Sequence, residues 1–529
     1  MKRRHFLAAA ASVAAPARAA LGQGAPAAPK VLRFIPQAMP AVLDPMVTTA
    51  AATRNHGFAV WDTLYGLNQD FAAEPQMAKD HLVENDGRRV TIRLREGLKF
   101  HDGEPVRAAD CIASIRRWAA RDPMGQVLMA RTEEIAADDD RSIVFRLQRP
   151  FPLLFDALAK VTPPVCFIMP ERLAATPADR PIGEIVGSGP FRFLAGEYEP
   201  GRHLAYARFG DYVPRAEGVT TWTAGPKRVL VDRVEWHAMA DAEASTNALL
   251  GGDVDWWESP PVSRQAELRG SRAVVMEITD PTGFVGMARF NHLHPPFDRP
   301  AVRHALFGAV VQEAFMTAVV GNDRSLWRDG VGFFGPGTPL ANDEGMAALA
   351  DPRDDAKVTR EIAEAGYGGE KVVVLMPSDF PTLAAIADIG AKMLRRVGME
   401  VELVADDWTA LVRRRASRAA PSQGGWGMFF TFWSGIDTAN PGVHQALRGN
   451  GEHAWFGWPT MPRMEELRAQ WFDSPDPDAQ KRIAREMQAE AFREAPYLPL
   501  GQYFQATVYR RGISGLLKGL PLFWNVQKG

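Results

Sequence analysis

The sequence has little cysteine, little tyrosine and almost no net charge. Its 529 residues include 2 cysteines and 8 tyrosines, and 61 basic residues nearly balance 63 acidic ones. This balance leaves no charge pattern typical of a nucleic-acid-binding protein. Cys111 and Cys166 both lie in apolar stretches, which favours two buried thiols and leaves a disulfide as the alternative.

The common catalytic motifs are also missing. The chain contains no H-E-x-x-H, C-x-x-C, G-x-S-x-G or G-x-x-x-x-G-K-S/T pattern. Residues 330–335 match G-x-G-x-x-G, but Pro336 and Pro339 follow where a helix would have to begin, so this segment is interpreted as a loop. We therefore expect no catalytic residue, no cofactor and no enzyme activity.

Metal-binding and membrane-spanning patterns are equally scarce. His292 and His294 could offer two metal ligands, but Pro295-Pro296 follows at once. We interpret the pair as a solvated loop, with a metal site as the alternative, and predict no bound metal. The longest uncharged stretch, residues 419–436, contains a proline and four glycines and would make a poor membrane-spanning helix.

The first 19 residues have the three-part layout of a bacterial export signal. A basic start at residues 2–4 precedes an apolar run at residues 6–15, and Ala17-Arg18-Ala19 offers a cleavage pattern before Ala20. The pair Arg3-Arg4 resembles a twin-arginine signal. An ordinary first helix is the alternative. We expect a mature protein that is soluble and periplasmic.

The remaining chain has an ordinary globular composition, with 46% hydrophobic and 23% charged residues. Its length predicts three or four folding units, or two large ones. Alternating apolar and polar residues predict strands at 90–95 and 142–147, with a helix at about 108–120 between them. This first part is interpreted as α+β.

The later part of the chain predicts a different arrangement. One helix is expected from its cap at Asp298 to Gly321. A strand at 371–376, a helix ending near Val397 and a strand at 399–403 predict a βαβ unit. The buried stripe of the first of these helices is expected to consist of Val302, Leu306, Val310 and Ala314.

The C-terminal part is expected to end in a long helix and an extended tail. Asp478 is expected to open the helix and Pro496 to end it, and the tail at 498–509 is expected to return to a sheet begun near the N-terminus. The predicted fold class is therefore α/β, a mixture of helices and strands in two regions.

Aromatic residues gather in one Gly-rich region. Tryptophan outnumbers tyrosine by 14 to 8, and nine Trp and Phe side chains fall between residues 408 and 458. Aromatic residues on loops are typical of a pocket wall, with plain core packing as the alternative. The candidates for ligand contact in this region are Trp408, Trp433, Ser434, Asp437, Trp455 and Trp458.

Several fragments along the chain resemble family 5 of the bacterial extracellular solute-binding proteins, the peptide, nickel and opine receptors of ABC importers. The most specific fragment runs from Leu94 to Pro105 and contains Lys99-Phe100-His101-Asp102-Gly103. Further matches follow the family's order: Val60-Trp61-Asp62-Thr63-Leu64, Gly187-Ser188-Gly189-Pro190-Phe191, Gly252-Asp253-Val254-Asp255, Phe290-Asn291, Pro296-Phe297-Asp298 and Glu364-Ala365-Gly366-Tyr367.

The resemblance implies a two-lobe clamshell that closes on a ligand. The first lobe would comprise residues 30–65, 188–285 and 497–529, with 66–187 inserted as an extra subdomain, and the second lobe would comprise 286–496. It also implies a monomer that delivers a small solute, peptide-like or otherwise amphipathic, to the permease subunits of an ABC importer. The segment Lys99–Gly103 would be a turn of the scaffold with no ligand role.

The ligand motif departs from that of the peptide-binding members, which carry Asp in the spacings Trp-x-x-Asp and Asp-x-x-x-Pro. Ile436 stands where the first spacing, counted from Trp433, would place Asp, whereas Asp437 satisfies the second spacing, counted from Pro441. Two other functions stay open at this point: an exported enzyme of unknown reaction, and a sensor partner that binds the same kind of solute.

Overall fold

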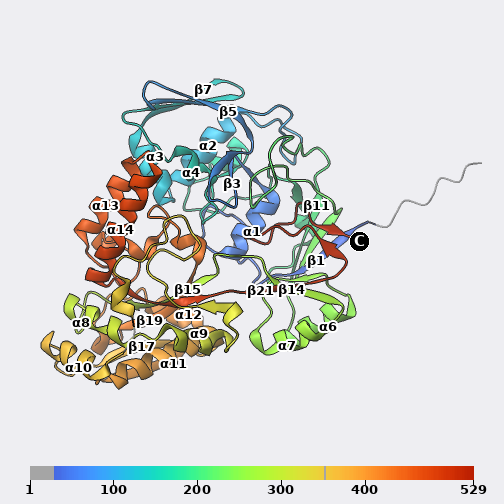
Figure 1. Ribbon diagram of the computed structural model, residues 1–529. Coiled ribbons are helices and arrows are strands. Elements are labelled where there is room, and N and C mark those ends of the chain that lie inside the picture. Colours follow the sequence, from blue (N-terminus) through green and yellow to red (C-terminus); the bar gives the residue numbers. More distant parts are fainter. Residues whose placement is uncertain (1–28, 351–352) are drawn as a thin grey trace, which may run out of the picture.

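The structure is a computed structural model and describes residues 29–350 and 353–529. The expected export signal and its cleavage position lie outside the described residues. Helices and strands are mixed throughout, and three large sheets organise the chain (Figure 1). No helix in the described part of the chain is both long and apolar enough to cross a membrane.

The first sheet has seven strands and is assembled from distant parts of the chain. Strand β1 lies in its middle, parallel to β12 and β13, and the C-terminal strand β21 pairs antiparallel with β13 and β14. The tail predicted at 498–509 returns to a sheet begun near the N-terminus only in its second part, because β20 (Tyr497–Tyr503) pairs with β15 (Phe284–Phe290) in another sheet. In spatial order the strands are β10 (Phe191–Phe193), β11 (His203–Arg208), β12 (Arg233–His237), β1 (Val31–Ile35), β13 (Trp256–Trp257), β21 (Ala506–Arg510) and β14 (Val274–Ile278).

The second sheet has six strands and contains the predicted βαβ unit. Strands β17 and β18 are parallel and are joined by helix α11 (Pro381–Arg396). Val372 and Val374 pack into the main core, whereas Val373 and Leu375 pack on the opposite face, as expected of a strand covered on both sides. The order is β16 (Trp327–Arg328), β20 (Tyr497–Tyr503), β15 (Phe284–Phe290), β19 (Met428–Ser434), β17 (Val372–Pro377) and β18 (Val401–Asp406).

The third sheet lies within residues 66–187, at the top of Figure 1. Its antiparallel strands are β5 (Ala78–Glu84), β6 (Arg89–Leu94), β8 (Ser142–Leu147) and β7 (Thr132–Asp139). The turn after β6 has the predicted scaffold role, because Gly103 has a φ of 93° and the His101 ring contacts the backbone of Gly187 and Gly189. The remaining described strands have two or three residues each and form three pairs: β2 (Asp62–Thr63) with β9 (Phe167–Ile168), β3 (Tyr65–Leu67) with β4 (Ala73–Pro75), and β22 (Ile513–Ser514) with β23 (Gln527–Lys528).

The helices cover these sheets and connect them. Besides α11 they are α1 (Ala51–Val60), α2 (Ala108–Ala119), α3 (Pro123–Arg131), α4 (Leu154–Ala159), α5 (Glu171–Ala174), α6 (Ala242–Gly251), α7 (Val262–Gly270), α8 (Pro300–Ala305), α9 (Gln312–Val320), α10 (Asp355–Glu364), α12 (Trp408–Arg414), α13 (Pro462–Asp473) and α14 (Pro477–Glu494). Figure 1 shows α13 lying against α3, which belongs to residues 66–187. There, Arg131 Nη2 lies 2.6 Å from Asp473 Oδ1.

Two expected helices differ from the structure. The single helix expected from Asp298 to Gly321 is wrong: it is broken into α8, a 3₁₀ turn at Leu306–Ala309 and α9, and Arg299 occupies the N-cap. Val310 and Val311 are extended at the break, where β-branched residues favour strand-like backbone. The last helix begins two residues earlier than expected, because the side chain of Asp476 caps it by accepting from Asp478 N and Ala479 N.

The two cysteines are buried and free. Burial raises the pKa of both thiols, of Cys111 and of Cys166, because a thiolate would lose its solvation there. The arrangement is that of two inert core thiols.

Candidate ligand-binding site

The candidate site lies where the chain passes between the first and second sheets. In the described chain this happens twice, at residues 279–283 between β14 and β15 and at residues 504–505 between β20 and β21. A cavity of about 110 Å³, called here the central cavity, is lined by Asp280 and Gln505 from these two connections. Residues at the carboxyl ends of β1, β13 and β19 also line it, together with residues of helix α1 and of the C-terminal segment 519–521.

Arg54 of helix α1 provides a buried positive charge at this cavity, with only 7% of its surface exposed. Its Nε donates to Asn55 Oδ1 at 3.2 Å, but the guanidinium forms no ion pair with any residue that the structure describes. A guanidinium offers five donors in a fixed plane and is suited to bind a carboxylate. Arg54 is therefore available to a ligand anion.

Three carboxylates face Arg54 across the central cavity. Asp437 stands on the 3₁₀ helix η6 (Gly435–Thr438), and its Oδ1 is buried without a hydrogen-bond partner among the described residues. Asp280 Oδ1 accepts from Thr282 N at 2.8 Å and from Thr282 Oγ1 at 2.7 Å. Glu258 Oε2 accepts from Gln37 N at 2.6 Å. None of the three has a direct ion pair in the described structure, so the cavity keeps unpaired charges of both signs.

Burial in the cavity wall shifts the pKa values of Arg54 and of the three carboxyl groups. Burial raises the pKa of Asp437 to about 6, although the positive charge of Arg54 partly opposes this. Burial also raises the pKa of Glu258 and of Asp280 and lowers that of Arg54. Each shift disfavours the charged form, as expected for ionised groups that lack a partner. A zwitterionic ligand would supply the missing partners.

Close backbone packing positions Asp437. The amide of Gly435 donates to Gly283 O at 2.7 Å, which ties η6 to the connection that carries Asp280. A Cβ atom at position 435 would lie 1.9 Å from Thr282 O, so only glycine allows this approach. The predicted candidates Ser434 and Asp437 both line the central cavity as a result.

A larger apolar groove of about 620 Å³ adjoins the central cavity. The two share four lining residues: Gln37, Ser259, Phe284 and Gln505. The predicted candidate Trp408 lines this groove and packs against Phe380, with ring centroids 5.9 Å apart. The groove can hold the apolar part of a ligand whose charged groups reach the central cavity.

The other predicted tryptophans lie in an aromatic cluster and do not line these two spaces. Trp433 contacts Trp455 edge to face at 5.2 Å, and Trp458 packs on Trp426 at 6.1 Å. Along β19 the side chains alternate, so Trp433 and Phe429, which both contact Trp455, point away from the face of Ser434. The structure thus brings together Ser434 and Asp437, with Trp408 nearby, but places Trp433, Trp455 and Trp458 in packing positions.

Arg54, Glu258 and Asp280 were not identified from the sequence. One signal was present: Glu258 directly follows β13, and its amide bonds to Ile35 O of the parallel strand β1. Polar residues just beyond the carboxyl ends of parallel strands are typical ligand contacts. Arg54 carries no comparable signal, because it lies inside a helix without any motif.

The two motifs that were set aside have structural roles. Residues 330–335 form an irregular loop, as predicted. The rings of His292 and His294 contact different carbonyls, Pro496 O at 3.3 Å and Arg418 O at 2.8 Å, and do not converge on one point.

One cluster of described residues has metal-ligand spacing. His203, Glu235 and His237 place one ligand atom each within 4.8 Å of the others. Glu235 is already paired with Arg233 at 2.6 Å and with Arg33 at 3.4 Å, and these cations oppose a metal ion at the same carboxylate.

Comparison with known proteins agrees with this architecture. The family model described as "Bacterial extracellular solute-binding proteins, family 5 Middle" matches residues 72–454. A relative from Sinorhizobium fredii, the "Probable peptide ABC transporter periplasmic-binding protein y4tO", is 37% identical over 96% of this chain and 95% of its own length. That similarity implies a periplasmic location for this chain.

Solved structures with the same fold have different ligands. AgaA of A. tumefaciens R10, in complex with agropinic acid, has a TM-score of 0.77 at 23% identity and covers 94% of this chain and 99% of its own. DppA of Helicobacter pylori, in complex with the peptide STSA, has a TM-score of 0.75 at 19% identity and covers 94% of this chain and 98% of its own.

These comparisons give no support to an exported enzyme. The chain belongs to family 5 of the bacterial extracellular solute-binding proteins and is a substrate-binding protein of an ABC importer, not an enzyme.

Proposed function

We propose that this protein binds a small zwitterionic solute with an apolar body, peptide-like or opine-like, and delivers it to its importer. The observation that carries this proposal is the buried guanidinium of Arg54, which faces three carboxylates without a direct ion pair. A ligand carboxylate would bind Arg54, and a ligand ammonium would bind Asp437 and its neighbours. Leaving such charges unpaired costs several kcal/mol, so ligands that match both signs are favoured.

Known ligands of similar proteins are consistent with this class. The S. fredii relative is named as a peptide-binding protein, and the two solved structures hold agropinic acid and the peptide STSA. The apolar groove beside Trp408 favours a ligand with a planar or aliphatic part, since aromatic walls bury a large area at little entropic cost.

The proposed mechanism is closure of two lobes around this solute. We propose the lobes expected from the sequence with one change, a tail boundary at residues 504–505 instead of 496–497; the pairing of β20 in the second sheet and of β21 in the first supports this change. We expect a monomer that is exported through its first 19 residues, by the twin-arginine route if Arg3-Arg4 is recognised, and that docks on the importer's permease subunits.

Native mass spectrometry of the purified protein tests the ligand class directly. We expect a retained solute that carries both an amine and a carboxylate, and isothermal titration with that solute should give one site per chain. Replacing Arg54 by Lys keeps the charge but loses the planar pair of donors, so binding should weaken about tenfold. Replacing the exposed Arg482 by Lys is the matched control. A retained solute without ionisable groups, or R54K binding like wild type, would contradict the proposal.

A further inference from the structure

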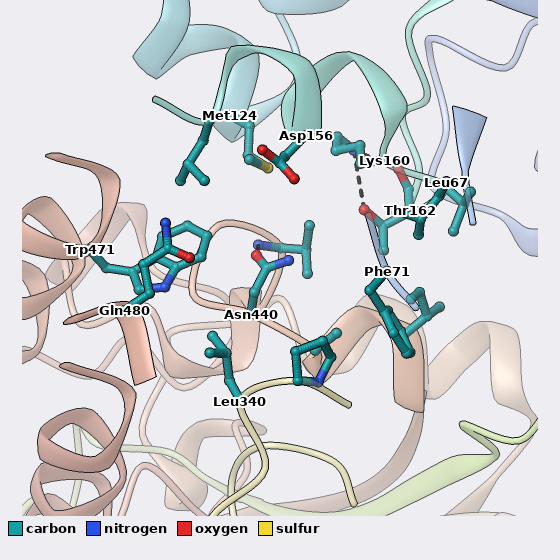
Figure 2. A pocket seen from close by; sticks show the side chains of 16 residues that line it. Leu67, Phe71, Met124, Asp156, Lys160, Thr162, Leu340, Asn440, Trp471 and Gln480 are labelled. Atoms are coloured by element: carbon teal, nitrogen blue, oxygen red, sulfur yellow. Dashed lines mark hydrogen bonds between the residues drawn. The ribbon is translucent and has the colours of Figure 1, made fainter. Parts of the chain in front are cut away.

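A second cavity, distinct from the central one, lies between the inserted part of the chain and the C-terminal helices (Figure 2). Its volume is about 130 Å³. The 3₁₀ helix η6 forms a wall shared by both spaces, because Ile436 lines this cavity whereas the next residue, Asp437, lines the central one. The wall is mostly apolar and includes Met124, Leu153, Leu340, Val443 and Trp471.

Among the described residues that line this apolar space, Asp156 on helix α4 alone carries a carboxylate. Figure 2 shows it at the upper edge, above Asn440. Asp156 forms no ion pair with any described residue, and burial raises its pKa. The half-buried carboxylate therefore stands at a mostly apolar wall without a cationic partner among the described residues, which is unfavourable unless something compensates for it.

The nearby cation is already engaged elsewhere. Among the described residues that line the cavity, Lys160 alone is cationic, and its Nζ lies 2.7 Å from Asp122 Oδ2. The same ammonium donates to Thr162 O at 2.5 Å and to Pro164 O at 2.7 Å. In Figure 2 the Lys160 side chain turns to Thr162 and away from Asp156. Asp156 thus lacks an internal counterion although a lysine is close in sequence.

We propose that this cavity binds an amine carried on an apolar ring or stem of about six carbons. A dry apolar cavity of about 150 Å³ holds one benzene molecule, so the present volume suits a group of that size. The ammonium would pair with Asp156, and the ring or stem would contact Met124, Leu340 and Trp471. This site stands on its own residues and does not depend on which solute occupies the central cavity.

Benzylamine and benzyl alcohol, which differ in the charged group, test this site by isothermal titration. Wild-type protein should bind benzylamine at least tenfold more tightly than benzyl alcohol. The variant D156N should lose at least tenfold in affinity for benzylamine, while the control D478N, which removes an exposed charge, should bind it like wild type. A thermal unfolding curve for D156N verifies that it is folded, and the comparison of the two probes on wild type needs no variant.

Equal binding of the two probes, or benzylamine binding that is lost in D437N but kept in D156N, would overturn the proposal. The second result would place the amine in the central cavity. Failure at Asp156 leaves the test at Arg54 unaffected, so the two proposals fail separately.

Discussion

Asp62 and Asp437 are both enclosed by protein, but their surroundings differ completely. Asp62 Oδ1 lies 2.7 Å from Lys227 Nζ, and its Oδ2 accepts from Tyr212 Oη at 2.7 Å. Burial alone would raise the pKa of Asp62, but attraction to Lys227 and the hydrogen bonds lower it. Asp437 lacks such partners, and burial raises its pKa to about 6. A buried carboxylate such as Asp62, which has both a cation and hydrogen-bond donors beside it, stabilises the fold. A buried carboxylate such as Asp437, which lacks these partners, can pair with a ligand.

The largest effect is expected from breaking the fully paired region. Replacing Lys227 by Met leaves Asp62 charged and buried, which should lower the free energy of unfolding by about 3–5 kcal/mol. The matched control is Lys99→Met, because Lys99 Nζ lies 2.8 Å from Asp211 Oδ2 in an exposed pair. That control should cost about 1 kcal/mol or less. Urea unfolding measures both, and equal losses would show that burial does not separate the two pairs.

At Asp437, in contrast to Lys227, we expect a substitution to cause no loss of stability. Replacing Asp437 by Asn removes an unpaired charge, so the ligand-free protein should be as stable as wild type or more stable. Affinity for an amine-bearing solute should fall at least tenfold, and affinity for a neutral analogue should change little. Titration calorimetry of both solutes measures this, with D478N as the control. A marked loss of stability in D437N would assign Asp437 to the fold instead.

The raised pKa of Asp437 predicts a pH dependence with a definite sign. Below the ordinary pKa of an aspartate, this carboxyl is protonated in the folded and unfolded states. As pH rises towards 6, the unfolded chain releases its proton first, so this group lowers the stability of the ligand-free protein over that range. Affinity for a cationic solute should change the opposite way, falling from pH 7.5 to pH 5 as the carboxylate is neutralised. Titrations at both pH values should show this in wild type and a much weaker trend in D437N.

A smaller effect is expected where residues 66–187 meet helix α13. Asp473 lies 2.6 Å from Arg131 and 3.4 Å from Arg149, and it is 47% exposed. Replacing it by Asn should weaken solute binding only two- to fivefold, because partly exposed pairs contribute about 1 kcal/mol or less. The control is Glu486→Gln, whose pair with Arg463 lies within one group of helices. An unchanged affinity would show that this contact does not favour the closed form.

How well the sequence predicts a part of the fold or of the candidate site depends on whether neighbouring or distant residues determine that part. The βαβ unit of β17, α11 and β18 was predicted because a β-branched run and a glycine stop act through neighbours in sequence. The helix expected from Asp298 was not, because periodicity alone does not reveal the break at Val310 and Val311. Ser434 and Asp437 were found through motif spacing and line the cavity, although their ligand-binding role is still a prediction.

The tryptophan residues show why amino-acid composition alone does not separate pocket residues from core residues. A Gly-rich aromatic segment predicts either a pocket wall or a core, and the alternation along β19 decides between them residue by residue. Ser434 lines the central cavity, whereas its neighbour Trp433 packs on Trp455. Neighbouring residues of a strand point to opposite faces of the sheet, and amino-acid composition does not show which residue points to which face.

The sequence by itself determined the family, the mixture of helices and strands and the absence of common catalytic motifs, because each depends on residue types at short spacing. Only the tertiary structure decided which charges are paired. Asp62 meets a lysine 165 residues away, whereas Arg54, Asp437 and Asp156 stay without ion-pair partners among the described residues. Ion pairs form between side chains that the packing of distant elements brings together, so a local sequence pattern does not predict which side chains will meet.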